Sequence, residues 1–212
     1  MGGHTDLLNL VLLNISIGKR SNIVTSADSI NSFINLKSDL ERLAVAIYLA
    51  ELINSLVPEE IPHIGVYHIF RRSLEELNKN QDPQIISRYL ELKILSETGY
   101  SQELYNCVLC RSEILPNQHS YNPSLGGVIC LNCPVNPSQS LPLSLNSLKV
   151  LRYFDRSELN HTLSINLDRQ VQSELEKVLN QSISWIIDKQ SKARKFVEHL
   201  QTIRENNSEV IS

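Results

Sequence analysis

Apolar and polar residues alternate with a period of two along residues 6–27. This alternation is typical of β-strands, and the polar residues 18–22 between its two halves are typical of a turn. The pattern therefore predicts a β-hairpin. Because both faces of its first strand are largely apolar, we expect that strand to lie in a sheet that is covered on two sides. An isolated two-stranded hairpin is marginal in water, so further strands are expected to pair with it.

From residue 38 the apolar positions recur every three or four residues, which is typical of helices. Ser38 and Glu41 are predicted to cap a first helix over residues 38–56. A second helix is predicted to begin near Pro62, and a third to begin with an Asp-Pro pair and end at a glycine, over residues 82–99. The apolar residues of this third helix lie on almost all of its sides. We therefore expect it to lie at the centre of a helical bundle.

Helical periodicity returns after a segment that contains the cysteines, over residues 144–154 and from about residue 166 onward. Residues 134–142 are rich in proline and serine and are predicted to form a loop. The predicted fold class is therefore mainly α with a small β part. Its expected parts are a β-hairpin over residues 1–30, a helical domain over 31–205 with a cysteine-containing insertion at 104–136, and a frayed tail over 206–212.

The four cysteines form two closely spaced pairs, Cys107-Val-Leu-Cys110 and Cys130-Leu-Asn-Cys133. Nineteen residues separate the pairs, which is the spacing of a four-thiolate zinc site. Each pair aims two thiolates at one point, and two such turns supply the tetrahedral set of soft ligands that Zn²⁺ favours. The protein would fill all four positions, so we expect the zinc to be structural. Disulfide bonds and an iron–sulfur cluster are the alternatives.

The composition and the net charge exclude several classes of protein. With 42% hydrophobic and 20% charged residues, the chain is an ordinary globular protein and not a disordered one. Its formal net charge of −3 excludes a histone-like basic protein, so contacts with nucleic acid would need local basic patches. No apolar run suits a membrane helix and no signal-peptide pattern is present, so we expect a cytoplasmic protein with reduced cysteines. Common catalytic motifs are absent too, so an enzyme is not expected.

Three groups of basic residues are candidate contacts with nucleic-acid phosphates. Lys19 and Arg20 lie at the predicted hairpin turn, and Arg71 and Arg72 lie in the second helix. The third group consists of Lys189, Lys192, Arg194 and Lys195. Each group alone is more typical of a solvated helix face or turn. Together, on a net acidic chain, they are compatible with phosphate contacts.

After the hairpin, the chain holds an ordered series of short patterns: Leu36-x-x-Asp39-Leu40-Glu41-Arg42-Leu43-Ala44-x-Ala46-x-Tyr48-Leu49-x-Glu51-Leu52, Tyr89-Leu90-Glu91-Leu92-Lys93-Ile94-Leu95, Gly99-Tyr100, the two cysteine pairs, Pro142-Leu143-Ser144 and Ser191-x-Ala193-Arg194-Lys195-Phe196. The order of these patterns resembles the RecO family of bacterial recombination mediators. Thr98 replaces an apolar residue that is common in the family. The resemblance covers nearly the whole chain.

The resemblance implies an N-terminal OB-fold barrel followed by a helical domain with a four-cysteine zinc motif. Cys107, Cys110, Cys130 and Cys133 would then be the zinc ligands, and Lys19 and Arg20 would lie in the last hairpin of the barrel. It also implies a nucleoid-associated protein of DNA repair and homologous recombination that acts without catalysis or a small-molecule substrate. Such a protein would bind single- and double-stranded DNA, contact single-strand DNA-binding protein, anneal strands, and load RecA together with RecR.

This chain departs from the family in its first domain. An OB barrel has five strands, and the sequence holds only about two of them, the final hairpin. Either the natural start lies upstream of Met1, or the barrel has been lost. We favour the first explanation, because an exposed apolar hairpin edge invites aggregation. The alternative function is a zinc-stabilised helical adaptor that binds partner proteins and never touches DNA.

Overall fold

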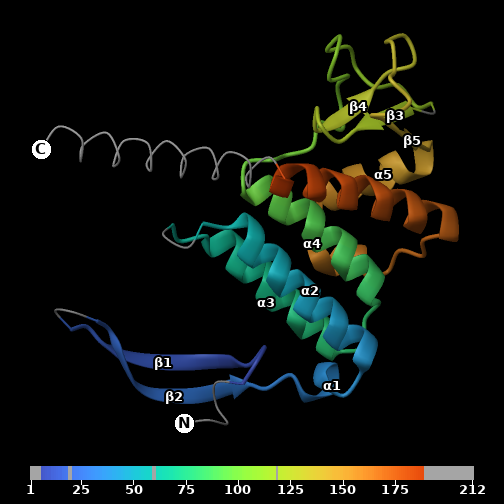
Figure 1. Ribbon diagram of the computed structural model, residues 1–212. Coiled ribbons are helices and arrows are strands. Elements are labelled where there is room, and N and C mark those ends of the chain that lie inside the picture. The colour runs from blue at the N-terminus through green and yellow to red at the C-terminus, as the bar shows by residue number, and fades with distance from the viewer. Residues whose placement is uncertain (1–5, 19–20, 59–60, 118, 189–212) are drawn as a thin grey trace, which may run out of the picture.

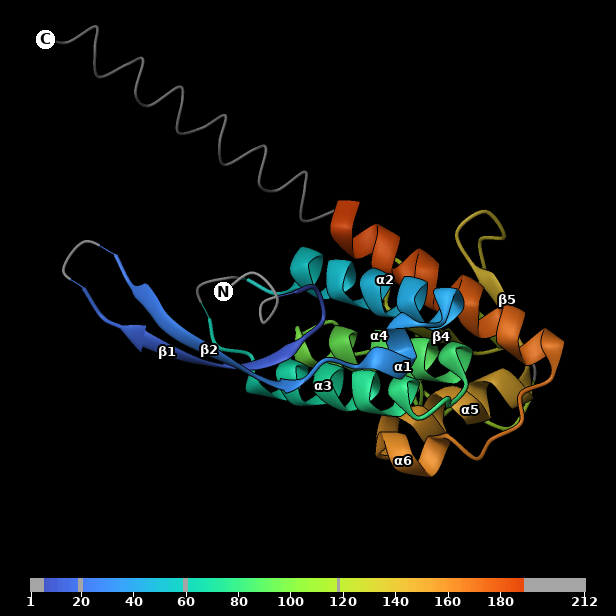
Figure 2. The same cartoon turned by 90° about the horizontal axis from the view of Figure 1, so that it is seen from below.

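The computed structural model describes residues 6–18, 21–58, 61–117 and 119–188. Its elements are, in chain order, β1 (Leu10–Ser16), β2 (Ile23–Asn31), α1 (Ile34–Lys37), α2 (Leu40–Leu56), α3 (Ile64–Asn78), α4 (Pro83–Glu97), β3 (His119–Asn122), β4 (Gly127–Ile129), β5 (Leu141–Leu143), α5 (Leu145–Arg156) and α6 (Leu159–Thr162). A further helix covers residues 169–188. The chain is thus mainly helical with a small β part, as predicted, and the β part consists of two small antiparallel sheets (Figures 1 and 2). Every helix in these ranges is too short or too polar to span a membrane.

Helix α4 lies at the centre of the helical part, where α2, α3, α5 and α6 pack around it (Figure 1). Ten of its fifteen residues are buried, which confirms the prediction from its apolar surround. Its N-terminus is capped by Asp82, whose side chain accepts a hydrogen bond from the Gln84 amide at 2.8 Å. At its C-terminus Gly99 adopts φ +86°, and the Tyr100 amide returns to the Leu95 carbonyl at 2.7 Å. This is a Schellman motif, which requires the left-handed conformation that glycine adopts without strain.

The N-cap of helix α2 lies one residue later than the sequence predicts. Ser38 is the C-cap of the short helix α1, and its backbone amide donates to the Ile34 carbonyl. The N-cap of α2 is Asp39, whose carboxylate accepts from the Arg42 amide at 3.0 Å. This hydrogen bond, with a second from the Arg42 side chain, lowers the pKa of Asp39. The predicted capping box of Ser38 and Glu41 is therefore wrong, because the end of α1 already occupies Ser38.

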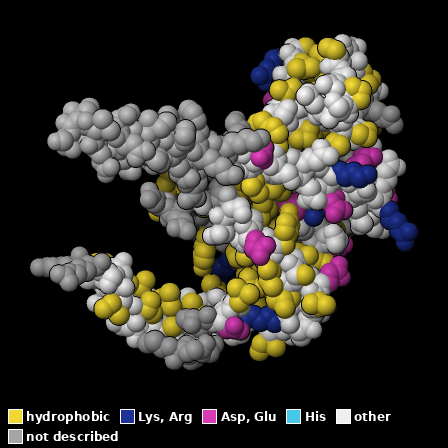
Figure 3. Space-filling model, in the orientation of Figure 1, with side chains coloured by type: hydrophobic (Ala, Val, Ile, Leu, Met, Phe, Trp, Pro, Cys, Tyr) yellow, Lys and Arg dark blue, Asp and Glu magenta, His cyan; other side chains and the backbone are white. Residues whose placement is uncertain are grey.

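Strands β1 and β2 form the predicted hairpin, in an antiparallel register that runs from Leu10 opposite Asn31 to Ser16 opposite Ile23. The hairpin extends away from the helices (Figures 1 and 2). Its surface carries exposed hydrophobic side chains (Figure 3). Leu12, for example, is 57% exposed. The expected cover on both faces is therefore missing from the described residues, which form a two-stranded sheet here and no barrel.

The second sheet, in the order β4-β3-β5, lies beside the cysteines. The sequence did not indicate β3 or β4, and β5 occupies the end of the predicted loop over residues 134–142. Leu141–Leu143 becomes a strand because β3 pairs with it, from His119 opposite Leu143 to Tyr121 opposite Leu141. The buried Tyr121 hydroxyl is also hydrogen-bonded to Ser182 (2.8 Å), in the helix over residues 169–188. The sheet is thereby fastened to the helical part.

Candidate functional site

The four cysteines come from two turns that face each other across a short backbone pairing. In the first turn, the Arg111 amide donates to the Cys107 carbonyl at 2.9 Å, and in the second the Cys133 amide donates to the Cys130 carbonyl at 3.2 Å. The strand β4 runs directly into the second turn. Its residue Val128 accepts a hydrogen bond from the Val108 amide of the first turn at 3.0 Å. The two turns are therefore joined directly by a backbone hydrogen bond.

Gly127 makes this close approach possible. Gly127 forms a parallel β-bridge with Glu103. The Glu103 amide donates a hydrogen bond to the Gly126 carbonyl, and the Val128 amide donates to the Glu103 carbonyl. A Cβ atom at Gly127 would lie 2.5 Å from the Glu103 carbonyl oxygen and 2.6 Å from a methyl group of Val108. Any larger residue would push the first turn away from β4. Gly127 is thus a requirement of this site.

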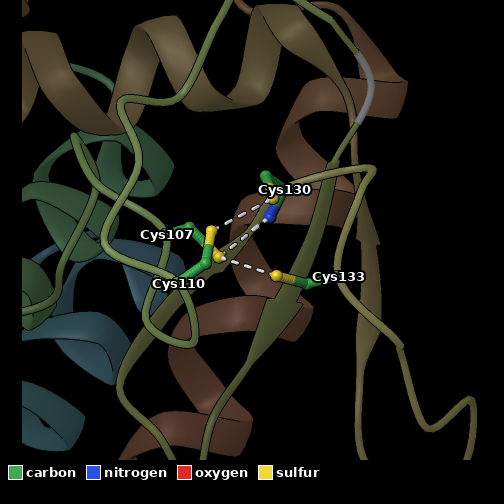
Figure 4. A group of neighbouring side chains, drawn as sticks. All are labelled: Cys107, Cys110, Cys130 and Cys133. Carbon is green, nitrogen blue, oxygen red and sulfur yellow. Dashed lines mark hydrogen bonds between the residues drawn. The ribbon is translucent and has the colours of Figure 1, made fainter.

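The four sulfur atoms converge on a single point (Figure 4). The Sγ atoms of Cys107 and Cys133 are 3.8 Å apart, those of Cys110 and Cys130 are 3.7 Å apart, and all four lie within 4.8 Å of one another. Zn–S bonds of about 2.3 Å in a tetrahedron place neighbouring sulfurs about 3.8 Å apart. All four cysteines are free, so none takes part in a disulfide bond. The arrangement is compatible with a structural metal ion.

The surroundings of Cys107, Cys110 and Cys133 shift the pKa values of their thiols. Hydrogen bonds from the Ser112 side chain and backbone lower the pKa of Cys110 to about 6. Burial opposes ionisation of Cys107, but backbone amides of Cys130, Cys110 and Leu109 lower the pKa of Cys107 overall. In contrast, the hydrogen bond to Cys110 and the other nearby thiols raise the pKa of Cys133 to about 12. Crowded thiolates repel one another, and a cation among them removes that repulsion.

Arg152 of α5 joins the cysteine segment to the helices. Its Nε donates to the Leu104 carbonyl at 2.9 Å, and Nη2 donates to the Ile114 carbonyl at 3.4 Å. Its guanidinium also lies 5.1 Å from the centre of the Tyr105 ring. These contacts lie on both sides of the first cysteine turn. Arg152 therefore attaches the cysteine segment to α5.

The structure tests the predicted basic residues only in part. Arg71 and Arg72 are exposed on α3, where Arg71 pairs with Glu75 at 2.9 Å and Arg72 donates to Asn160 at 3.3 Å. They line a hollow that also contains Glu75 and Glu76, so its charge is mixed. Lys19, Arg20, Lys189, Lys192, Arg194 and Lys195 lie outside the described residues.

A second basic surface, on α5, was missed by the sequence reasoning. Lys149, Arg152 and Arg156 line a hollow of about 590 Å³ together with Tyr153. These cations are not adjacent in the sequence, so a search for runs of charge does not find them. Their spacing of three and four residues on a predicted helix is the signal that would have found them.

Comparison with known proteins then identifies the family. The family model described as "Recombination protein O C terminal" matches residues 37–195. The chain belongs to the RecO family. A "DNA repair protein RecO" of Dehalococcoides mccartyi (strain CBDB1) is 31% identical over 200 residues, which are 94% of this chain and 79% of the relative. A protein of the same name from Roseiflexus sp. (strain RS-1) is 28% identical over 208 residues, 98% of this chain and 74% of the relative.

The RecO family match includes the main features of the site. Residues 37–195 contain α2 to α6, both cysteine turns and the basic hollow on α5. The hairpin of β1 and β2 precedes this range, although the alignments with the two RecO relatives cover nearly the whole chain. The resemblance seen in the sequence is thereby confirmed, and the chain is a member of a family of DNA repair proteins.

Proposed function

We propose that this chain is a recombination mediator that binds DNA without catalysing a reaction. The observation that carries the proposal is the family match over residues 37–195, together with RecO relatives that align with 94% of the chain or more. As in the family, the protein would bind single- and double-stranded DNA of the nucleoid and anneal complementary strands. It would also contact single-strand DNA-binding protein and load RecA together with RecR.

The direct test is salt-dependent binding to single-stranded DNA. Fluorescence anisotropy of a labelled oligothymidylate, titrated with the protein at several salt concentrations, should show affinity that falls linearly on a log–log plot. Each phosphate contact contributes a slope of about −0.7 for a single strand. Failure to bind at the lowest salt would overturn the proposed function. An annealing assay with complementary strands, with and without single-strand DNA-binding protein, then tests the mediator step.

We further propose that the metal is Zn²⁺, held by Cys107, Cys110, Cys130 and Cys133. The sulfur separations of 3.7 and 3.8 Å support one tetrahedral ion, whereas a disulfide would bring two sulfurs to about 2 Å. The irons of a multi-iron cluster would hold the cysteines further apart. When bound, the ion supplies a cross-link between the two turns and no open position for chemistry.

Metal analysis of purified protein tests the zinc proposal. We expect about one zinc ion per chain. The double variant Cys107→Ser, Cys133→Ser should lose it, because serine is a poor ligand for zinc. The matched control is Ser112→Ala, which removes the hydroxyl 3.0 Å from the Cys110 sulfur but keeps all four ligands. Purified protein without zinc, or a double variant that still holds it, would contradict this assignment.

The hairpin supports a proposal on domain organisation. We propose that residues 1–30 belong to a larger β-structure of the OB type, and that residues 31–205 form the helical domain with the metal-binding insertion at 104–136. Both faces of the hairpin carry exposed hydrophobic side chains, including Leu12 (57%) and Ile15 (53%). Binding of a hydrophobic dye should therefore fall in the variant Leu12→Thr, Ile15→Thr. Unchanged dye binding would show that these faces are already covered.

The rival function is the zinc-stabilised adaptor that binds proteins and not DNA. It is favoured by two exposed leucines at the tips of the cysteine turns, Leu109 (45%) and Leu131 (65%). Changing Lys189, Lys192, Arg194 and Lys195 to alanine distinguishes the two functions. A mediator that uses these residues loses DNA affinity, whereas the adaptor hypothesis predicts no change in it.

A further inference from the structure

We propose that the exposed face of α5 binds the phosphate backbone of single-stranded nucleic acid. This inference rests on the proposed DNA-binding function and assigns a surface to it. The surface is the hollow of about 590 Å³ lined by Lys149, Val150, Arg152, Tyr153, Arg156 and Ile165. We call it the α5 basic hollow. α5 lies at the edge of the helical part, away from the hairpin (Figure 2).

The helix geometry places its cations on one face. At about 100° per residue, the three cations Lys149, Arg152 and Arg156 fall within an arc of about 60° around the helix. With Tyr153 included, the arc is about 100°. From Lys149 to Arg156 the helix rises about 10 Å, the length of about three stacked nucleotides. A row of three cations with this spacing can therefore meet consecutive phosphates of one strand.

The charge of the α5 basic hollow is uncompensated. Its described lining contains three cations and no carboxylate. Neither Lys149 nor Arg156 forms an ion pair within the described ranges of the chain. The acidic residue of this helix, Asp155, does not line the hollow and accepts a hydrogen bond from the Tyr105 hydroxyl at 3.3 Å. The hollow on α3 is different, because two glutamates lie among its cations. A polyanion is the ligand that complements such a surface.

Aromatic and apolar groups in the hollow favour a nucleic acid over an acidic peptide. The Tyr153 ring is half-buried, with its hydroxyl donating to the His161 carbonyl at 3.0 Å and the Arg156 guanidinium 6.0 Å from its centre. The ring is thus fixed beside a cation. Proteins that bind single strands combine a basic groove with aromatic rings on which bases stack. Val150 and Ile165 add apolar surface on which a base or sugar can lie.

The three cations differ in how they can be tested. Arg152 also donates to the Leu104 and Ile114 carbonyls, so its removal would disturb the metal-binding segment. Lys149 and Arg156 are exposed and have no such structural hydrogen bonds among the described residues. The test variant is therefore Lys149→Ala, Arg156→Ala. The control is Lys177→Asp, which changes the net charge by the same two units at an exposed position outside the hollow.

The experiment measures binding of a fluorescein-labelled oligothymidylate by the full chain and both variants over a range of salt. We expect the double variant to bind about tenfold more weakly, with a log–log salt slope smaller in magnitude by about 1.4, or about 0.7 for each lost phosphate contact. The Lys177→Asp control should keep the slope of the unmodified chain. Zinc content and melting temperature of each variant show that the fold is intact.

The outcomes separate this inference from the proposed function. If the unmodified chain and the double variant bind equally, the α5 inference is wrong while DNA binding stands. If the unmodified chain binds no DNA at low salt, both are wrong. The competitor is an oligoglutamate at the same concentration of charge as the DNA. If it displaces the DNA, and if this displacement depends on Lys149 and Arg156, the ligand of the hollow is an acidic peptide and not a nucleic acid.

Discussion

The pH dependence of stability should report on a carboxylate buried at the centre of α4. Glu91 is fully buried, and its Oε1 accepts hydrogen bonds from the hydroxyls of Tyr48 (2.9 Å) and Ser87 (3.2 Å). The same oxygen lies 3.0 Å from Nη2 of Arg88. Burial raises the pKa of Glu91 to about 7, although Arg88 and the two hydroxyls act in the opposite direction. Burial therefore outweighs the favourable contacts of the charged form.

The size and sign of the effect follow from this raised pKa. In the unfolded chain the carboxyl has its ordinary pKa of 4.5, against about 7 in the folded protein. Between these values the folded state holds a proton that the unfolded state has released. The free energy of unfolding therefore falls as the pH rises, by at most about 1.4 kcal/mol per pH unit. The full shift corresponds to about 3 kcal/mol, of which about 2 kcal/mol falls between pH 5.5 and 8.

The assay compares the unmodified chain with Glu91→Gln by urea unfolding across this pH range. Glutamine does not titrate, and effects of other groups are common to both proteins. The stability of the unmodified chain minus that of the variant should therefore drop by about 2 kcal/mol from pH 5.5 to 8. The exposed Glu51→Gln is the matched control and should show no such drop. A difference for Glu91→Gln that stays constant with pH would refute the reasoning.

Three further predictions concern single contacts and the metal. Gly99→Ala should destabilise the protein by about 1 kcal/mol or more in urea unfolding, because φ is +86° there; an unchanged midpoint would contradict the Schellman assignment. Tyr121→Phe should cost about 1–2 kcal/mol, since its buried hydroxyl is hydrogen-bonded to Ser182 and Gln102, and a neutral effect would show that this link is dispensable. Chelation should increase amide hydrogen exchange in residues 104–133 while α4 stays protected, and uniform loss of protection would mean that the metal supports the whole fold.

Features set by neighbouring residues were predictable from the sequence. The ends of α4 follow from Asp82 and Gly99, and its central position follows from apolar residues on all sides. The cysteine pairs were predictable because two residues between ligands suffice to aim both sulfurs at one point. The start of α2 was predicted less well. Ser38 and Asp39 can both cap a helix, and only the presence of α1 decides in favour of Asp39.

Long-range contacts explain what the sequence did not indicate. β5 is a strand only because β3 lies beside it, and β4 holds the two cysteine turns together through Val108 and Val128. The α5 basic hollow also escaped prediction, since its cations are spaced along the helix and do not form a run of charge.

By itself, the sequence determined the longer helices, the hairpin, the two cysteine pairs and the family resemblance, because each depends on spacing within a short stretch of chain. Only the tertiary structure decided that four sulfurs converge within 4.8 Å, that Arg152 ties their segment to α5, and that Glu91 is buried beside Arg88. Those features depend on which distant surfaces pack together. Packing is a property of the whole chain, and local patterns do not specify it.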